Sequence, residues 1–371
     1  MFFYKEEAVV PPPSFDFTVS STAELITAIG AATAGDSIFV SAGNYTLTSS
    51  LSISKSLRLF GAGSGSTIFQ TAGTSADPVT MVTVSSDNVV FKDITFKHRK
   101  TSNTSVETAI SISAGGFPTF TYPKNFIMDG CRVEYLEFGV VIRGEGFKLA
   151  NNRFVYATGT AGNSNRCIGI YGQKGNCFIA NNIFDNSVLS STAFRPIYST
   201  STNATSNELT TGALIVSGNT NVGAAVQQFY NQDNLRGTTG GYDLYFLNNT
   251  INETSLFVGL WNGAANVGNI IGKIVLDGNT ASGIHGGTPL GTKGMLNIDN
   301  SGTFRSTNLP VYVGTNTQTN QTFRTGYVAI TQNPASTVPA YLLGRASAVT
   351  VTANVSTVIP SAPAMQETPT S

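Results

Sequence analysis

The amino-acid sequence predicts an all-β protein built as a parallel β-solenoid, in which short strands and turns stack coil upon coil. The main observation behind this prediction is a six-residue unit that recurs through the middle of the chain. Successive units start 21 to 37 residues apart, which fits a coil of roughly 21–22 residues with insertions of about 8–15. Paired Gly and Asn residues, together with β-branched residues at period two, exclude a helical repeat.

The columns of this unit indicate what each position does. The first position is always apolar, and its residues are Phe91, Met128, Leu149, Ile179, Val216, Phe246, Leu276 and Ile298. The third position is Asp, Gly or Asn, which tolerate a left-handed backbone, so we expect a strand end, a sharp bend and a new strand. The fourth position is asparagine in five successive units, and we predict that these stack as an amide ladder: Asn152, Asn182, Asn219, Asn249 and Asn279.

The segment before the repeat predicts a short helix. Residues 21–24 read Ser-Thr-Ala-Glu, a capping box that opens a helix over 22–33. Leu25, Ile26 and Ile29 share one face of it, so we expect this N-terminal helix to cap the first coil and to cover an otherwise open sheet end. Gly and Asp at 35–36 end the helix, and strands are predicted over 37–40, 51–53 and 57–61.

The chain divides into three predicted parts. Residues 1–17 form an extended Pro-rich N-terminal arm, because the three prolines at 11–13 favour polyproline II. The solenoid covers 18–305. Residues 306–371 form a C-terminal β region and tail, with strands predicted over 311–313, 326–330 and 349–352. These strands are either final coils or a small β-domain.

The composition excludes several partners. The 21 Lys and Arg balance the 21 Asp and Glu, so no basic excess exists for nucleic-acid binding. Charged residues make up only 11%, and no apolar run of about 18–20 residues predicts a membrane span. The first seven residues are too short and too acidic for a secretory signal. We therefore expect neither nucleic acid nor a membrane span, and we detect no signal peptide.

The cysteines do not indicate a metal site or a cofactor. Cys131, Cys167 and Cys177 lack metal-ligand spacing, and no cluster of Cys and His accompanies them. Three buried free thiols are the first interpretation, and a Cys167–Cys177 disulfide is the alternative.

The first part of the predicted solenoid resembles a known family. Residues 35–40 (Gly-Asp-Ser-Ile-Phe-Val), 43–45 (Gly-Asn-Tyr) and 57–63 (Leu-Arg-Leu-Phe-Gly-Ala-Gly) look like the opening of pectin-lyase-like right-handed parallel β-helices. The asparagine column resembles the ladder of that superfamily. The resemblance covers about residues 20–305 and implies a right-handed parallel β-helix. It implies no single function, because the superfamily includes lyases, hydrolases, esterases, phage tailspikes and non-catalytic surface proteins.

The catalytic signatures of the best-known members are missing. Pectate lyases carry Trp-x-Asp-His and Arg-x-Pro-x-x-Arg, whereas Trp261 here precedes Asn-Gly, and Arg195-Pro196 lacks the outer arginines. Polygalacturonases carry Asn-Thr-Asp, Asp-Asp, Gly-His-Gly and Arg-Ile-Lys. The nearest sequence here is Gly-Ile-His-Gly at 283–286, and neither Asp-Asp nor Arg-Ile-Lys occurs.

A site without those signatures would need carboxylates that converge on one face. Glycoside hydrolysis uses two carboxylates about 5–10 Å apart, and Glu134, Glu137, Glu145 and Asp185 lie in or beside neighbouring coils. A lyase needs a base and a cation to neutralise a uronate, which Arg143, Lys148 or Arg166 could supply. The weak catalytic candidates are therefore Glu145, Asp185, Arg143 and Arg166, against the alternative of solvated faces and ion pairs. His98 and His285 are isolated and are more typical of structural or surface histidines.

Two hypotheses of function follow. The first is a non-enzymatic structural or attachment protein of a virion, a capsid or tail surface component that contacts other virion proteins, further copies of itself or a surface glycan. Its location would be the virion surface or another extracellular surface. The second is a polysaccharide lyase or glycoside hydrolase of the tailspike or pectate-lyase type. The insertions 187–211 and 221–242, with aromatic residues among short polar ones, are a candidate binding surface or plain loop packing.

Overall fold

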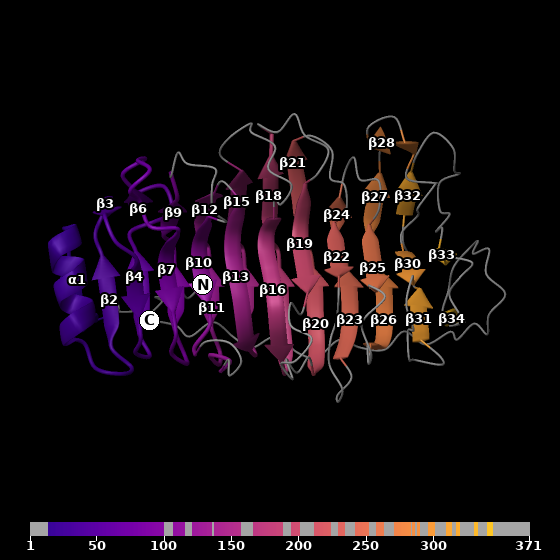
Figure 1. Cartoon of the computed structure of the whole chain (residues 1–371), viewed down its shortest axis with the longest axis horizontal. Helices are drawn as coiled ribbons and strands as arrows, with labels where there is room; N and C mark the ends of the chain where they lie inside the picture. Colours follow the sequence, from indigo (N-terminus) through magenta and orange to yellow (C-terminus); the bar gives the residue numbers. More distant parts are fainter. Residues whose placement is uncertain are drawn as a thin grey trace, which may run out of the picture.

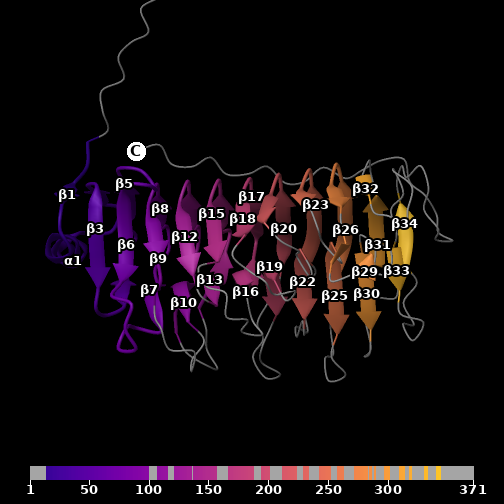
Figure 2. The ribbon, with the colours of Figure 1, turned by 90° about the horizontal axis from the view of Figure 1, so that it is seen from above.

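The protein is a long stack of coils built from three parallel sheets (Figures 1 and 2). The computed structural model describes residues 14–99, 107–115, 121–135, 137–156, 166–187, 194–200, 211–223, 229–233, 242–251, 257–262, 271–282, 284–285, 288–289, 296–300, 309–313, 317–319, 330–332 and 340–343. Every strand pair in the three sheets is parallel, as expected when each strand returns one coil later. The predicted all-β parallel fold is therefore confirmed.

Sheet A has twelve strands. In spatial order they are β1 (Phe17–Val19), β2 (Ser37–Val40), β5 (Arg58–Gly61), β8 (Val90–Lys92), β11 (Ile127–Asp129), β14 (Lys148–Ala150), β17 (Asn176–Ala180), β20 (Gly212–Ser217), β23 (Tyr242–Leu247), β26 (Ile271–Asp277), β31 (Leu309–Val313) and β34 (Ala340–Leu343).

Sheets B and C have ten strands each. Sheet B contains β3 (Gly43–Leu47), β6 (Thr67–Thr71), β9 (Thr95–Lys97), β12 (Arg132–Tyr135), β15 (Arg153–Tyr156), β18 (Ile183–Asn186), β21 (Thr220–Gly223), β24 (Thr250–Ile251), β27 (Thr280–Ser282) and β32 (Thr317–Thr319). Sheet C contains β4 (Leu51–Ile53), β7 (Thr80–Val84), β10 (Thr108–Ile112), β13 (Phe138–Glu145), β16 (Arg166–Lys174), β19 (Arg195–Thr200), β22 (Tyr230–Asp233), β25 (Val258–Asn262), β30 (Leu296–Asn300) and β33 (Ile330–Gln332). A small antiparallel pair, β28 (Ile284–His285) and β29 (Thr288–Pro289), lies outside these sheets.

The strands after residue 305 continue the same sheets. β31 pairs with β26, β32 pairs with β27, and β33 pairs with β30, all in parallel. Of the two alternatives for this region, the described strands therefore match further coils. The prediction of strands over 349–352 and of the tail falls outside the described residues, as does most of the predicted arm, and the division of the chain at residue 305 stays a prediction.

One helix, α1 (Thr22–Ala31), is present in the described part of the chain. The Ser21 hydroxyl accepts a hydrogen bond from the Glu24 N–H, as the capping box predicts. The helix ends two residues before the predicted 33, because Ala32 takes an extended backbone. Leu25 and Ile29 are buried while Ile26 is 53% exposed, so the buried face is narrower than predicted. The helix packs against β1 and β3 at one end of the stack (Figure 1), and its role as a cap stays a prediction.

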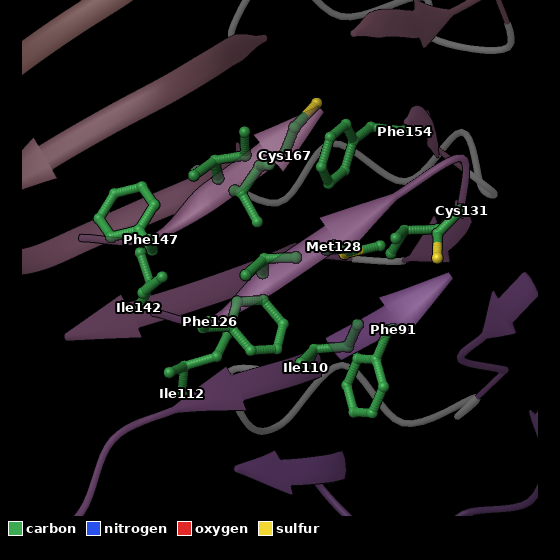
Figure 3. Close-up of a cluster of buried hydrophobic side chains, with 14 of the residues drawn as sticks. Phe91, Ile110, Ile112, Phe126, Met128, Cys131, Ile142, Phe147, Phe154 and Cys167 are labelled. Atoms are coloured by element: carbon green, nitrogen blue, oxygen red, sulfur yellow. The ribbon is translucent and has the colours of Figure 1, made fainter. Parts of the chain in front are cut away.

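The interior is a column of apolar side chains (Figure 3). The first-position residues of the repeat face inward, where Phe91 and Met128 lie beside Ile110 and Ile112 of sheet C. Aromatic rings continue from coil to coil: the Phe154 and Phe184 centroids are 5.6 Å apart, and those of Phe229 and Phe257 are 5.0 Å apart. Burial of this column in every coil supplies most of the driving force for stacking.

The turn between sheets A and B follows the predicted columns. Residues at the third position have positive φ angles of 54 to 67°, and they are Asp93, Gly130, Asn151, Asn181, Gly218, Asn248 and Gly278. This left-handed backbone suits Gly, Asn and Asp and strains most other residues. The predicted bend is confirmed.

The fourth-position asparagines lie next to one another inside the stack. The distance from Nδ2 of each side chain to Oδ1 of the next is 2.9 to 3.0 Å from Asn152 through Asn182, Asn219 and Asn249 to Asn279. Each Nδ2 also donates to the carbonyl of a first-position residue in the preceding unit, as Asn219 does to Ile179 at 2.9 Å. All five asparagines are at most 1% exposed, so these hydrogen bonds are shielded from water.

Candidate functional site

Sheet C carries the longest strands of the described chain, β13 and β16, beside β19. Their register aligns Val141 with Gly169 and Gly169 with Tyr198. Ile168 and Ile170 belong to the core, so Gly169 and Tyr171 point to the opposite, outer face. A Cβ on Gly169 would lie 3.1 Å from ring carbons of both Phe138 and Tyr171. The glycine therefore makes room for these rings side by side.

Two arginines lie against these rings. The Arg166 guanidinium carbon is 3.5 Å from the Tyr198 ring centroid and 5.3 Å from that of Phe138. The Arg143 guanidinium carbon is 5.2 Å from the Tyr171 centroid. Tyr171 lies 6.5 Å from both Phe138 and Tyr198, centroid to centroid. We call these five residues the arginine–aromatic patch. Such contacts contribute about 0.5–2 kcal/mol each and hold the cations in fixed positions.

A carboxyl group borders the patch. Glu137 precedes β13, and its carbonyl accepts a hydrogen bond from the Arg166 N–H at 3.0 Å. Burial raises the pKa of the Glu137 carboxyl, although a backbone hydrogen bond at Glu107 and the charge of Arg166 oppose the rise. The same strand edge brings Glu107 close, because its carbonyl accepts from the Phe138 N–H. A carboxyl with a raised pKa keeps its proton closer to neutral pH and can donate it.

The tyrosine at the centre of the patch also has a shifted pKa. Burial raises the pKa of Tyr171, and the charges of Arg166 and Arg143 together with a hydrogen bond from Arg166 oppose the rise. Further along β16, Lys174 Nζ lies 4.5 Å from the Tyr122 ring centroid. Gln173, which lies between Tyr171 and Lys174 in β16, is 1% exposed. Within the described residues, neither polar atom of its side chain has a hydrogen-bond partner.

The structure brings together only some of the candidate residues. Arg143 and Arg166 meet at Tyr171, as described above. Glu145 lies at the far end of β13, where it is aligned with Lys174 and its carboxylate is 3.7 Å from Lys124 Nζ. It is therefore an ion-pair partner at a strand end.

Asp185 lies on β18, in sheet B, whereas Glu145 lies in sheet C. Its carboxylate is 2.6 Å from Arg153 Nη2 and accepts a hydrogen bond from the Ser187 hydroxyl at 2.7 Å. Burial opposes ionisation, but the bonds from Ser187 and Arg153 outweigh it and lower the pKa of Asp185. The two carboxylates thus sit on different sheets in separate contacts.

The other acidic and basic residues named from the sequence also have structural settings. Glu134 lies on sheet B, with its carboxylate 2.8 Å from both Lys97 Nζ and Arg132 Nε. Lys148 lies on sheet A and is buried. His98 is buried, with Nε2 3.0 Å from the Pro78 carbonyl oxygen.

The cysteines are free and buried, so the alternative of a Cys167–Cys177 disulfide is wrong. Cys167 lies in β16 of sheet C and Cys177 in β17 of sheet A, and both face the core. Within the described ranges no group of three or more His, Cys, Asp or Glu residues could hold a metal ion. Over the same ranges, no helix is long and apolar enough to cross a membrane.

Sequence reasoning singled out Arg143 and Arg166 but missed their ring partners Phe138 and Tyr171. Both aromatics lie outside the insertions 187–211 and 221–242, whose aromatic residues are the predicted candidate binding surface. A signal existed in the strand alternation, since Tyr171 follows the inward pair Ile168 and Ile170 at an outward position.

Comparison with solved structures identifies the fold class. The chain has a parallel β-helix fold, so the predicted resemblance is confirmed at the level of the fold alone. No family model and no curated protein matches the sequence.

Three structures illustrate the similarity. The catalytic unit of a GH87 α-1,3-glucanase from Streptomyces thermodiastaticus matches 87% of the chain with a TM-score of 0.55 and 14% identity, and the chain spans 59% of that protein. An alginate lyase from Paenibacillus sp. matches 92% of the chain and 97% of its own length with a TM-score of 0.52 and 12% identity. A DFA-IIIase from Arthrobacter chlorophenolicus matches 86% and 88% with a TM-score of 0.51 and 15% identity.

Proposed function

We propose that the chain is a non-enzymatic attachment protein that binds a glycan through the arginine–aromatic patch of sheet C. The setting we propose is the surface of a virion, in its capsid or tail, or a similar extracellular assembly. The observation that carries the proposal is the arginine Arg166, which stacks 3.5 Å over Tyr198 within a row of rings on one face. Phe138 and Tyr198 are 2% and 6% exposed, so they hold the patch in shape, and the partly exposed Tyr171 and the two arginines offer the ring edge and the fixed donors for hydroxyl or carboxylate groups.

Two further observations support binding without cleavage. The signatures of pectate lyases and polygalacturonases are missing from the sequence. The two carboxylates first considered, Glu145 and Asp185, lie on different sheets and are each held by a cation. Glu145 and Asp185 therefore do not form the facing pair of carboxyl groups that glycoside hydrolysis needs.

A polysaccharide lyase or glycoside hydrolase is the second candidate, and Glu137 is the observation that favours it. Its carboxyl has a raised pKa and lies beside Arg166, next to the patch. In that case a protonated Glu137 would donate its proton to the leaving oxygen, while Arg166 and Arg143 would neutralise charge on the sugar. The carbohydrate-acting proteins that share the fold fit this candidate and the attachment protein about equally.

A binding and turnover assay tests both candidates. The wild-type chain and the variants Arg143→Ala and Tyr198→Ala are applied to an array of acidic and neutral polysaccharides. We expect each variant to lose about tenfold or more in affinity, the effect of about 1.4 kcal/mol. Lys273→Ala is the matched control, because Lys273 Nζ lies over the Tyr245 ring at 5.5 Å but on sheet A.

The same polysaccharides are then assayed for new ends. Binding without new reducing or unsaturated ends supports the attachment protein. Release of such ends that stops in Glu137→Gln supports the enzyme instead. If no polysaccharide binds, or if Lys273→Ala weakens binding as much as Arg143→Ala, the patch is not the binding site and both candidates are wrong.

A further inference from the structure

The pairing of β13 with β16 is irregular at the edge of the arginine–aromatic patch. Ile142 of β13 is aligned with Ile170 of β16. The next aligned residues are Arg143 and Gly172, so β16 has one extra residue at this point, Tyr171. This is a β-bulge, which interrupts the alternation of side chains along a strand and changes the face to which the following residues point.

The bulge places two consecutive residues of β16 on the outer face of sheet C. Tyr171 is on this face, where its ring lies beside the Arg143 guanidinium. Gly172 is aligned with Arg143 and shares its face, as aligned residues of neighbouring strands do. In regular alternation Gly172 would instead point inward with Ile170, which belongs to the core.

Gly172 leaves room for a further aromatic ring on this face. A Cβ at this position would lie 2.7 Å from the Tyr122 hydroxyl oxygen and 2.8 Å from a carbon of its ring. Both distances are well inside the ~3.5–4.0 Å at which carbon atoms pack. Tyr122 belongs to the connection between β10 and β11, and its ring reaches β16, two strands away from β10 in sheet C. It can lie there because Gly172 has no side chain.

A further cation lies over this ring. Lys174, two residues after Gly172, points to the same face of the sheet, and its Nζ is 4.5 Å from the Tyr122 ring centroid. The acidic residue aligned with Lys174 is Glu145, whose carboxylate is 3.7 Å from Lys124 Nζ. We call Tyr122 and Lys174 the lysine–tyrosine pair.

The outer face of β16 thus carries a cation against a ring near its start, its middle and its end. In order, the contacts are Arg166 with Tyr198, Arg143 with Tyr171, and Lys174 with Tyr122. The three cations and the rings of Tyr171 and Tyr122 are half-buried, so part of each side chain faces solvent. The strand is nine residues long, which is roughly 26 Å at ~3.3 Å per residue. A single sugar ring is much shorter, so it can reach only one of these contacts.

We propose that the binding site extends along β16 to the lysine–tyrosine pair, and that its ligand is an internal segment of a linear polysaccharide lying along the strand. This proposal rests on the glycan binding proposed above and adds the length and the direction of the ligand. Hydroxyl or carboxylate groups of successive sugars bind Arg166, Arg143 and Lys174 in turn. The accessible parts of the Tyr171 and Tyr122 rings contact the apolar faces of the sugars.

Oligosaccharides of increasing length test the proposal in the full chain. They are prepared from the polysaccharide that binds most tightly in the array, and their dissociation constants are measured by isothermal titration calorimetry. We expect the affinity to rise with length until the ligand spans β16 and then to stay constant. The shortest ligands should bind at the Arg166 end, where the cation lies closest to its ring.

Two variants separate the far end of the site from the patch. Lys174→Ala removes the cation of the lysine–tyrosine pair, and Gly172→Ala displaces the Tyr122 ring. Each should weaken the longest ligand about tenfold and leave the shortest one unchanged. Tyr198→Ala should weaken ligands of every length, and Lys273→Ala is again the control. Thermal melting checks that the variants fold, and Lys174→Ala alone decides the question if Gly172→Ala does not.

The outcomes distinguish this proposal from the function on which it rests. The extended site is overturned if a single sugar binds as tightly as the longest chain, or if Lys174→Ala binds every ligand as the wild type does. In both cases a loss of binding in Tyr198→Ala leaves the patch as the binding site. If no oligosaccharide binds, or if Tyr198→Ala has no effect, the proposed function is wrong and the extended site with it.

Discussion

The Asn219→Ala substitution should destabilise the protein strongly, because it removes the middle of the buried asparagine row. The Asn219 side chain takes part in four hydrogen bonds. Its Nδ2 donates to the Ile179 carbonyl at 2.9 Å and to Asn249 Oδ1 at 2.9 Å. Its Oδ1 accepts from the backbone N–H of Asn182 at 2.9 Å and from Asn182 Nδ2 at 3.0 Å. Alanine can replace none of these bonds.

The magnitude follows from the burial of the partners. Asn182, Asn219 and Asn249 are all 0% exposed, so water cannot take the place of the lost side chain without a rearrangement of the turn. Four bonds at about 1 kcal/mol each give an expected loss of about 4 kcal/mol in the free energy of unfolding. The buried N–H of Asn182 loses its acceptor, Asn219 Oδ1. The loss per hydrogen bond should therefore lie at the upper end of the range for neutral hydrogen bonds.

Urea unfolding followed by circular dichroism measures this loss. The matched control is Asn44→Ala, an exposed asparagine in β3, which should change stability by less than about 0.5 kcal/mol. Hydrogen exchange at the Asn182 amide should also become faster in Asn219→Ala. A loss below about 1 kcal/mol, or one equal to that of the control, would refute the reasoning that these side-chain bonds hold neighbouring coils together.

Two other predictions concern ionisable groups. The pKa of Asp185 is lower in the folded protein than in the unfolded chain, where it is ~3.9, so the ionised carboxylate stabilises the fold above that pH. This stabilisation is lost as the pH falls through the lower folded pKa. Asp185→Asn should therefore make the melting temperature depend less on pH in acid. Equal acid sensitivity in wild type and variant would count against this assignment. Burial raises the pKa of Cys131 and of Cys177 to about 12, so neither thiol should react with Ellman's reagent in the native protein at pH 8, and both should react in guanidinium chloride. Rapid native reaction of either thiol would contradict its burial.

The fold was predictable because stacking constrains single positions. A residue at the third position of the unit must take a positive φ angle, and a residue at the fourth position must form hydrogen bonds to the coils above and below. Residue types that meet these demands, such as Asn181 and Asn182, therefore indicate the turn in the sequence. Length was harder to predict. The helix α1 stops at Ala31 because of the backbone of Ala32, which no residue type enforces.

The candidate site was less predictable, since it depends on contacts across coils. Arg166 and Tyr198 are 32 positions apart in the sequence, and only the register of β16 and β19 brings them together. The choice of Glu145 and Asp185 assumed that charged residues from adjacent coils converge. Each coil has three faces, however, and the sequence alone did not assign these two carboxylates to sheets C and B.

The side-chain amides of the asparagine row also have aligned dipoles. Every side-chain amide in it points the same way: Nδ2 faces the Oδ1 of the following coil, from Asn152 to Asn279. At the start of the row the backbone N–H of Cys131 donates to Asn152 Oδ1 at 2.9 Å and continues the same orientation. Aligned amide dipoles add along their axis and polarise one another when water is excluded. The asparagine row therefore has two electrically different ends, independent of the zero net charge of the chain.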